Sequence, residues 1–268
     1  MNLRYITCSD PREFNDIHDI VKLAMISKRV EIAVQAHPSK MSPGMPRNEW
    51  FRELLDFVIR DKYDINLAVH VNQEWCDYIC RKGKIPFELK EFFASCHNGD
   101  CYKPVIARWQ LNVPAKTANN MNIRALKQLL NSNLGKKFII QYNNNTSDVV
   151  HSLYRARAQF SVLYDASGGR GISPQSWAEP VFSGRPQGYS GGLSPENIAT
   201  NLDKISRVAN RSIPLYDAHD NIVICYAPRD DIWIDAEGKL KTDNKFDVAR
   251  ARQYILNAEN WLQHQKQK

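Results

Sequence analysis

The chain has 268 residues, 43% of them hydrophobic and 24% charged, and its formal net charge is +7. This balance is typical of a folded globular protein and excludes low-complexity or fibrous classes. The basic excess favours an anionic partner. Because Lys and Arg are spread along the chain without a basic block, a phosphorylated small molecule is favoured over nucleic acid.

No segment approaches the roughly 18 apolar residues that a membrane span requires, so no membrane partner is predicted. The first residues, MNLRYITCSD, pass directly into a strand-like run rather than a secretory signal. The 6 cysteines are therefore expected to be reduced thiols. Together these features predict a cytoplasmic protein.

Short apolar runs alternate with longer helical segments along the chain. Several runs, such as VEIAV, are apolar at consecutive positions, which is typical of strands buried on both faces of a parallel sheet. The predicted strands cover residues 4–8, 30–36, 65–71, 105–111, 137–142, 160–166, 188–191 and 232–235.

The segments between these strands have helical periodicity, as in EWFRELLDFVI, NIRALKQLLNS and SPENIATNLDKISRV. The alternation predicts a parallel α/β fold, most economically a closed (β/α)₈ TIM barrel formed by residues 1–268 as a single domain. A doubly wound sheet would give the same local pattern. A monomer and a homodimer are both compatible with it.

The alternation is interrupted between the seventh and last predicted strands. Two β-rich runs flank the turn-forming residues 218–221 in SIPLYDAHDNIVICYAPRDD. We interpret residues 212–230 as a small hairpin inserted before the last strand.

The segment YSGGLSPENI has the pattern of an anion-binding strand-to-helix turn. Gly191 and Gly192 follow the seventh strand, and Ser194 is a good N-cap for a helix. Glycines allow backbone N–H groups to approach an anion, and a helix N-terminus favours negative charge. Barrels commonly hold phosphate after their seventh and eighth strands. A tight turn without a ligand is the structural alternative.

Two further positions could carry chemistry at strand ends. Asp165 ends the sixth strand before a glycine-rich loop that includes Gly169, which could fold over a ligand. Cys8 ends the first strand, where a thiolate could act as a base. An acid capping a loop and a small buried thiol are the structural alternatives.

These segments together resemble phosphoribosylanthranilate isomerase. The shared features are ITCSD at Cys8, QLN at residues 110–112, LYDASGGRG at Asp165 and SGGLSPEN at the seventh strand, and IDAEGKLKTDNKFD resembles the family's last strand and loop. The resemblance runs along most of the chain. It implies a (βα)₈ barrel and an Amadori rearrangement of N-(5-phosphoribosyl)anthranilate, with no cofactor.

The resemblance also implies roles for individual residues. Cys8 would be the general base and Asp165 the general acid, while Gln110, Asn112 and Gly169 would bind the substrate. Gly238, in the loop after the last strand, would join Gly191, Gly192 and Ser194 in holding the phosphate.

Three positions differ from the family pattern. Ser9 replaces the glycine after the cysteine, and Asn112 stands where a histidine-glycine pair is usual. The arginine-bearing loop after the second strand is replaced by AHPSKMSPGMPRNEW, where Arg47 or Lys40 would supply the cation.

A zinc site is the main alternative chemistry. Cys76 and Cys80, followed by Cys96 and Cys101, have permitted zinc spacings. WCDYIC has no turn between its cysteines and is expected to be continuous helix, so no metal is predicted. Three functions remain open: an isomerase of a phosphorylated aminosugar, a related barrel acting on another phosphosugar, and a non-catalytic binding protein on the same scaffold.

Overall fold

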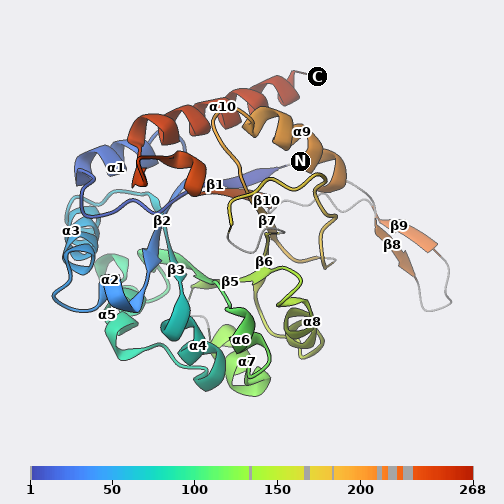
Figure 1. Ribbon diagram of the computed structural model, residues 1–268, viewed down its shortest axis with the longest axis horizontal. Helices are drawn as coiled ribbons and strands as arrows, with labels where there is room; N and C mark the ends of the chain where they lie inside the picture. The colour runs from blue at the N-terminus through green and yellow to red at the C-terminus, as the bar shows by residue number, and fades with distance from the viewer. Residues whose placement is uncertain are drawn as a thin grey trace.

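The computed structural model describes residues 2–132, 135–165, 170–182, 184–209, 213–216, 222–225 and 232–267. Eight parallel strands close into a barrel in the order β1-β10-β7-β6-β5-β4-β3-β2 (Figure 1). The predicted (β/α)₈ barrel is therefore confirmed, and the doubly wound alternative is excluded because β1 pairs with both β2 and β10.

The strands lie within a few residues of their predicted positions. Those of the barrel are β1 (Leu3–Ser9), β2 (Val30–Ala36), β3 (Asn66–Val71), β4 (Ile106–Leu111), β5 (Lys137–Tyr142), β6 (Ser161–Tyr164), β7 (Gln187–Ser190) and β10 (Ile232–Ala236). Two short hairpins lie outside the barrel: β8 (Ile213–Tyr216) with β9 (Ile222–Cys225), and β11 (Lys241–Thr242) with β12 (Lys245–Phe246).

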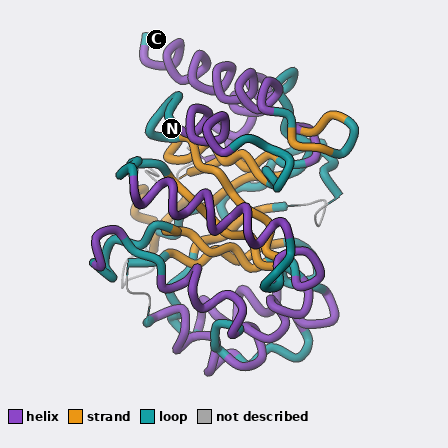
Figure 2. The backbone as a smooth tube through the Cα atoms, turned by 90° about the vertical axis from the view of Figure 1, so that its left-hand side faces the viewer, coloured by secondary structure: helices purple, strands orange, loops and turns teal. Residues whose placement is uncertain are grey.

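Helices surround the barrel on its outer side (Figure 2). They are α1 (Ile17–Ala24), α2 (Pro38–Met41), α3 (Pro46–Arg60), α4 (Gln73–Lys82), α5 (Lys90–Ala94), α6 (Ala115–Ala118), α7 (Ile123–Asn131), α8 (Ser147–Arg155), α9 (Ile198–Ala209) and α10 (Val248–Lys266). Three short 3₁₀ turns accompany them: η1 (Phe87–Leu89), η2 (His97–Gly99) and η3 (Gly238–Leu240). In the described part of the chain, no helix is both long and apolar enough to cross a membrane.

Two connections depart from strict alternation. Between β6 and β7, the described residues 170–182 and 184–186 form a loop without a helix, anchored by the buried side chains of Trp177 and Phe182. The predicted hairpin is present as β8 and β9, which extend away from the barrel in Figure 1. The other residues of the predicted insertion, 212, 217–221 and 226–230, lie outside the described residues.

Successive side chains of each strand point alternately into the barrel and outward. The outward residues, such as Ile6, Val69 and Ile140, form one apolar core with the surrounding helices. Inside the barrel, the apolar side chains form a small separate cluster of Ile139, Leu163 and Trp233, with Tyr5 against it.

Gly188 makes room for the largest of these side chains. A Cβ atom at this position would lie 2.1 Å from Cε2 of Trp233, so only glycine fits beside the indole.

An ion pair occupies the barrel interior beside this cluster. Nη1 of Arg108 lies 2.8 Å from Oε1 of Glu31, and both side chains are almost wholly buried. The guanidinium also lies between the rings of Tyr5 and Trp233, 4.3 Å from each centroid. Such aromatic contacts favour a desolvated cation. The interior of the barrel therefore contains charged as well as apolar side chains. Polar side chains also line its end at the carboxyl ends of the strands.

Candidate active site

A cavity of about 160 Å³ opens at the carboxyl ends of the barrel strands, where barrel enzymes hold their active sites. Its walls carry carboxylates, carboxamides and the glycines of three loops. The lining residues include Gln110, Asn112, Gln141, Asp165, Arg170, Gly191, Gly192, Asp235, Gly238 and Lys239. Six of the ten site residues predicted from the sequence therefore meet at one cavity: Gln110, Asn112, Asp165, Gly191, Gly192 and Gly238.

Asp165 and Asp235 are two buried carboxylates that line this cavity. Asp165 follows β6, and its N–H donates to the carbonyl of Tyr142 at 3.1 Å, which continues the ladder with β5. Its Oδ2 accepts a hydrogen bond from Nε2 of Gln141 at 2.7 Å. Asp235 lies on β10, in register with Thr7 on β1 and Ser190 on β7.

Burial raises the pKa of Asp235 to about 6, and the nearby Asp165 charge adds to the increase. Three neighbours oppose this by favouring the ionised form: the hydroxyl of Ser9 donates to Oδ1 at 2.6 Å, Gln110 also bonds to the carboxylate, and Arg108 adds positive charge. A carboxyl group with a pKa of about 6 can give or accept a proton near neutral pH.

His70 lies on β3 and faces the same cavity. Burial lowers its pKa to about 4, so the ring is neutral near pH 7. Its Nδ1 lies 3.4 Å from Nε2 of Gln35 and 3.5 Å from Nε2 of Gln110. Because amide nitrogens only donate, Nδ1 is the acceptor and the ring proton is on Nε2.

The rim above the carboxylates carries backbone N–H groups. Gly191 and Gly192 follow β7 with φ values of 119° and 62°, a backbone that favours glycine. A Cβ atom on Gly192 would lie 2.5 Å from the backbone nitrogen of Ser173, because the loop after β6 packs directly on this turn. Among the described residues, the N–H groups of Gly191, Gly192 and Leu193 have no protein acceptor.

The loop after β10 adds the N–H groups of Gly238 and Lys239 at the start of η3. Among the described residues, these N–H groups also have no acceptor. Lys239 and Arg170 line the same rim and bring positive charge. The rim thus has the composition of an anion site.

Ser194 is close to the rim without lining the cavity. It is buried, and its N–H donates to Oδ1 of Asn197 at 2.9 Å. The regular helix α9 begins at Ile198, three residues later than a helix capped by Ser194 would. The N–H of Ile198 still bonds to the carbonyl of Ser194, so residues 194–197 form a turn that leads into the helix.

Cys8 points away from the cavity, which corrects the expectation that it meets the substrate there. Its neighbours Thr7 and Ser9 face the barrel interior, where they bond to Glu31 and Asp235. By alternation, Cys8 faces outward, and it packs in the core shared with the helices. Burial, together with the charges of Asp235 and Glu31, raises the pKa of this thiol, the opposite of the expected thiolate-favouring setting.

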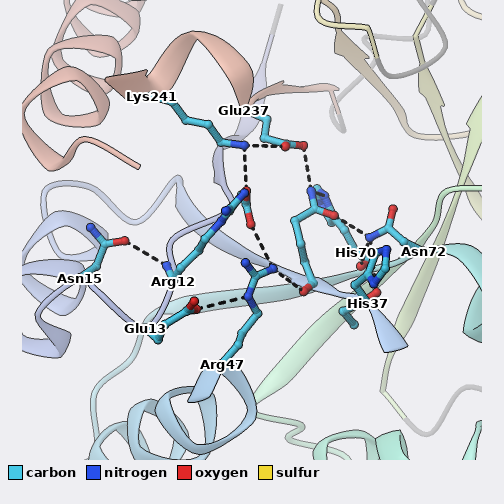
Figure 3. A network of polar contacts seen from close by, with 12 residues as sticks. Arg12, Glu13, Asn15, His37, Arg47, His70, Asn72, Glu237 and Lys241 are labelled. Atoms are coloured by element: carbon cyan, nitrogen blue, oxygen red, sulfur yellow. Dashed lines mark hydrogen bonds and ion pairs between the residues drawn. The ribbon is translucent and has the colours of Figure 1, made fainter. Parts of the chain in front are cut away.

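Arg47 lies in a neighbouring cavity of about 570 Å³ beside β2, β3 and β4. Its guanidinium is buried and already paired, with Nη1 3.5 Å from Oδ1 of Asp10 and Nε 3.4 Å from Oε2 of Glu13 (Figure 3). Lys40 lines the same cavity. Gly169, the remaining predicted substrate-binding residue, lies outside the described residues.

The cysteines of the zinc alternative are only partly brought together. Sγ of Cys76 and Sγ of Cys80 are 4.0 Å apart in the continuous helix α4. Among the described residues, no group of three or more His, Cys, Asp or Glu side chains is arranged to hold a metal ion.

Sequence reasoning missed Asp235 and Gln141, and it favoured a structural role for His70 as an isolated histidine. Asp235 was part of the segment that resembles the family's last strand, and its place near the carboxyl end of an apolar strand was the same signal that identified Asp165. His70 and Gln141 stand at alternate positions of apolar strands with no local signal of their own. The barrel brings them to the cavity because β3, β4, β5 and β6 are adjacent.

The fold and the site define a (β/α)₈ barrel with a carboxylate-lined cavity at the carboxyl ends of its strands. No family model and no curated protein matches the sequence. Among solved structures, a phosphoribosylanthranilate isomerase in complex with reduced 1-(o-carboxyphenylamino)-1-deoxyribulose 5-phosphate is similar, with a TM-score of 0.50 and 13% identity over 97% of this chain and 100% of that one.

TrpF from Jonesia denitrificans also matches, with a TM-score of 0.48 and 14% identity over 96% of this chain and 98% of that one. N-(5'-phosphoribosyl)anthranilate isomerase from Pyrococcus furiosus gives a TM-score of 0.47 and 12% identity over 96% and 98%. At these identities the likeness establishes the barrel fold and nothing finer.

Proposed function

We propose that the protein is an isomerase of a phosphorylated sugar or aminosugar, of the aldose–ketose type. The observation that carries this proposal is the pair of buried carboxylates, Asp165 and Asp235, lining one cavity below a rim of unbonded backbone N–H groups. The motif resemblance agrees with this class of chemistry, and the residues of the cavity supply its parts.

The phosphate would bind at the rim. Phosphate oxygens accept several hydrogen bonds at once, and the N–H groups of Gly191, Gly192, Leu193, Gly238 and Lys239 are available as donors. Ser194 acts indirectly, because its bond to Asn197 holds the turn that directly follows Gly191, Gly192 and Leu193. The sugar would then extend into the cavity between the two carboxylates.

The carboxylates would divide the proton transfers between them. We assign Asp235 as the acid, because its raised pKa keeps a protonated fraction near neutral pH. It gives its proton to the ring oxygen as the C1–O bond breaks, and the nitrogen lone pair of an aminosugar forms the C1=N bond. Asp165 then takes the C2 proton, and the resulting enaminol tautomerises to the aminoketose. This assignment gives Asp165 the base role that the resemblance implied for Cys8.

Proton abstraction can be tested without knowing the natural substrate. The protein is incubated in D₂O with N-(5-phosphoribosyl)anthranilate and with simple aldose phosphates, and deuterium incorporation at C1 of the ketose product and at C2 of the recovered aldose is followed by NMR. We expect exchange with at least one compound, and a loss of about 10²-fold or more in Asp165→Asn and in Asp235→Asn. A wild-type protein that binds these phosphosugars and exchanges none of them would refute the proposal.

A further inference from the structure

The second cavity, the one of about 570 Å³ that contains Arg47, adjoins the first. The two cavities differ in the side chains that line them. Asn112, Gln141 and Glu237 line both cavities, so one ligand can extend from the phosphate rim into the larger space. Among the described residues that line the second cavity, the apolar ones are Val113, Pro114 and Ala115, and none is Phe, Tyr or Trp. Carboxamides predominate instead.

Three of these carboxamides and Gln110 of the first cavity form a continuous hydrogen-bonded chain, which we call the carboxamide ladder. Nε2 of Gln110 donates to Oδ1 of Asn112 at 2.9 Å, and Nδ2 of Asn112 donates to Oδ1 of Asn72 at 2.9 Å. Nδ2 of Asn72 donates to Oε1 of Gln35 at 2.7 Å. Nε2 of Gln35 donates to Oε2 of Glu237 at 2.9 Å.

Glu237 fixes the direction of the ladder. A carboxylate only accepts hydrogen bonds, so Gln35 must present its NH₂ group to Glu237 and its carbonyl to Asn72. The same constraint passes along the chain to Gln110. Lys241 holds Glu237 in place, with Nζ 2.9 Å from Oε1 (Figure 3). Each amide is thus oriented before a ligand arrives, which lowers the cost of binding.

The ladder leaves both donors and acceptors for a ligand. Asn112 uses one N–H and one carbonyl lone pair within the ladder, so one of each remains at the junction of the two cavities. A sugar hydroxyl both donates and accepts, and it matches such a pair. An aromatic ring in the same place would cover these groups without replacing their bonds to water, which is unfavourable.

Apart from the exposed Lys40, the charged side chains of this wall are paired with one another, so the wall offers an anionic group little unpaired charge. Asp10 is bound by Arg12, by Arg47 and by Lys241, whose Nζ lies 2.8 Å from Oδ2 (Figure 3). Arg47 also pairs with Glu13. The buried cations of this wall are therefore engaged with carboxylates, and the carboxamides are the groups that face the space.

We infer that the substrate carries a second, uncharged polyhydroxyl group beyond its phosphosugar, bound along the carboxamide ladder. This inference rests on the proposed function and names its substrate class: a phosphorylated sugar bearing a further sugar or polyol, in place of an aromatic amine.

Two phosphorylated glycosides test the inference by binding alone. Trehalose 6-phosphate and phenyl α-D-glucopyranoside 6-phosphate share the α-linked phosphoglucosyl unit and differ in the attached group, a sugar or a benzene ring. Both are non-reducing, so neither can be isomerised. By isothermal titration calorimetry, we expect the disaccharide to bind at least tenfold more tightly.

Variants connect this preference to the ladder. Asn112→Leu keeps the side-chain volume and removes the amide, and we expect it to reduce the preference to threefold or less, mainly by weakening the disaccharide. The control Gln128→Leu changes an exposed carboxamide on α7 and should leave the preference unchanged. If Asn112→Leu does not fold, the side-chain NH₂ resonances of the wild-type ladder should shift with the disaccharide and not with the phenyl glycoside.

Equal or tighter binding of the phenyl glycoside overturns the inference and leaves the isomerase proposal standing. Preference for the disaccharide without deuterium exchange in any phosphosugar refutes the isomerase alone. Failure of both glycosides to bind refutes the phosphate rim and the inference together.

Discussion

Replacing Asp235 by asparagine should stabilise the protein above pH 6 while abolishing its proposed catalysis. The wild-type carboxyl has its pKa raised from 3.8 to about 6 on folding, chiefly by burial. A folded-state pKa above the unfolded value means that the folded protein binds the proton more tightly. The contribution of this group to the free energy of unfolding is therefore complete below pH 3.8 and is lost as the pH rises through 6. Because one pKa unit corresponds to about 1.4 kcal/mol, the loss is about 3 kcal/mol.

The carboxamide introduced by Asp235→Asn would carry no charge at any of these pH values, so the variant avoids this loss. The bond from the Ser9 hydroxyl, which is 2.6 Å long and charge-assisted in the ionised wild type, already contributes to the wild-type pKa, so its weakening in the variant takes nothing further from the difference. We expect the variant to be more stable than wild type by about 3 kcal/mol at pH 8 and about equal to it at pH 4.

Urea unfolding of both proteins at pH values from 4 to 8 measures this difference. The exposed Asp56 on α3 provides the control, since Asp56→Asn makes the same chemical change outside the barrel interior. A pH-independent difference for Asp235→Asn, or a variant that is less stable than wild type at pH 8, would show that Asp235 is not held protonated by burial. The proposed acid role would then lose its physical basis.

The remaining predictions concern Cys8, Gly238 and Arg108. Cys8→Ala should reduce turnover by less than threefold and lower the free energy of unfolding by about 1–2 kcal/mol; a 10²-fold loss would mean that the thiol reaches the substrate. In wild type, the buried thiol of Cys8 should react with a thiol reagent far more slowly than the exposed Cys101, as mass spectrometry of the labelled peptides would reveal. Gly238→Val should weaken the binding of inorganic phosphate at least tenfold by calorimetry. The circular dichroism spectrum should be unchanged, because no protein atom lies within 4 Å of a Cβ atom at this position. Undiminished binding would remove this loop from the phosphate site. Arg108→Leu leaves the buried Glu31 carboxylate without its cation and should destabilise the protein by about 3–5 kcal/mol in urea unfolding, so a cost below about 1 kcal/mol would contradict the importance of the pair.

The sequence was sufficient for the barrel because its evidence is local. Runs such as VEIAV are apolar at consecutive positions, and strands covered on both faces require this. The glycine pair Gly191 and Gly192 could be predicted as a rim turn, and the structure supplies the reason for it, because their positive φ values and the packing of Ser173 tolerate no side chain. Asp165 was identified because it ends such a strand, where barrels place polar groups at one rim.

The face of a strand was not decided by its sequence. In a strand buried on both sides, apolar and polar residues do not alternate clearly, and a shift of one residue exchanges the faces. Cys8 was therefore expected at the rim cavity, although its neighbours Thr7 and Ser9 are the residues that face inward.

Interactions between distant strands were decided only by the tertiary structure. The pKa of Asp235 depends on burial and on Ser9, Gln110 and Arg108, which come from β1 and β4, far from β10 in the sequence. The carboxamide ladder likewise joins residues that lie on or directly after β2, β3 and β4 with the loop after β10, and each amide is unremarkable in its own segment. Short-range patterns determine which elements form, whereas closure of the barrel determines which side chains meet, because only closure brings the first and last strands together.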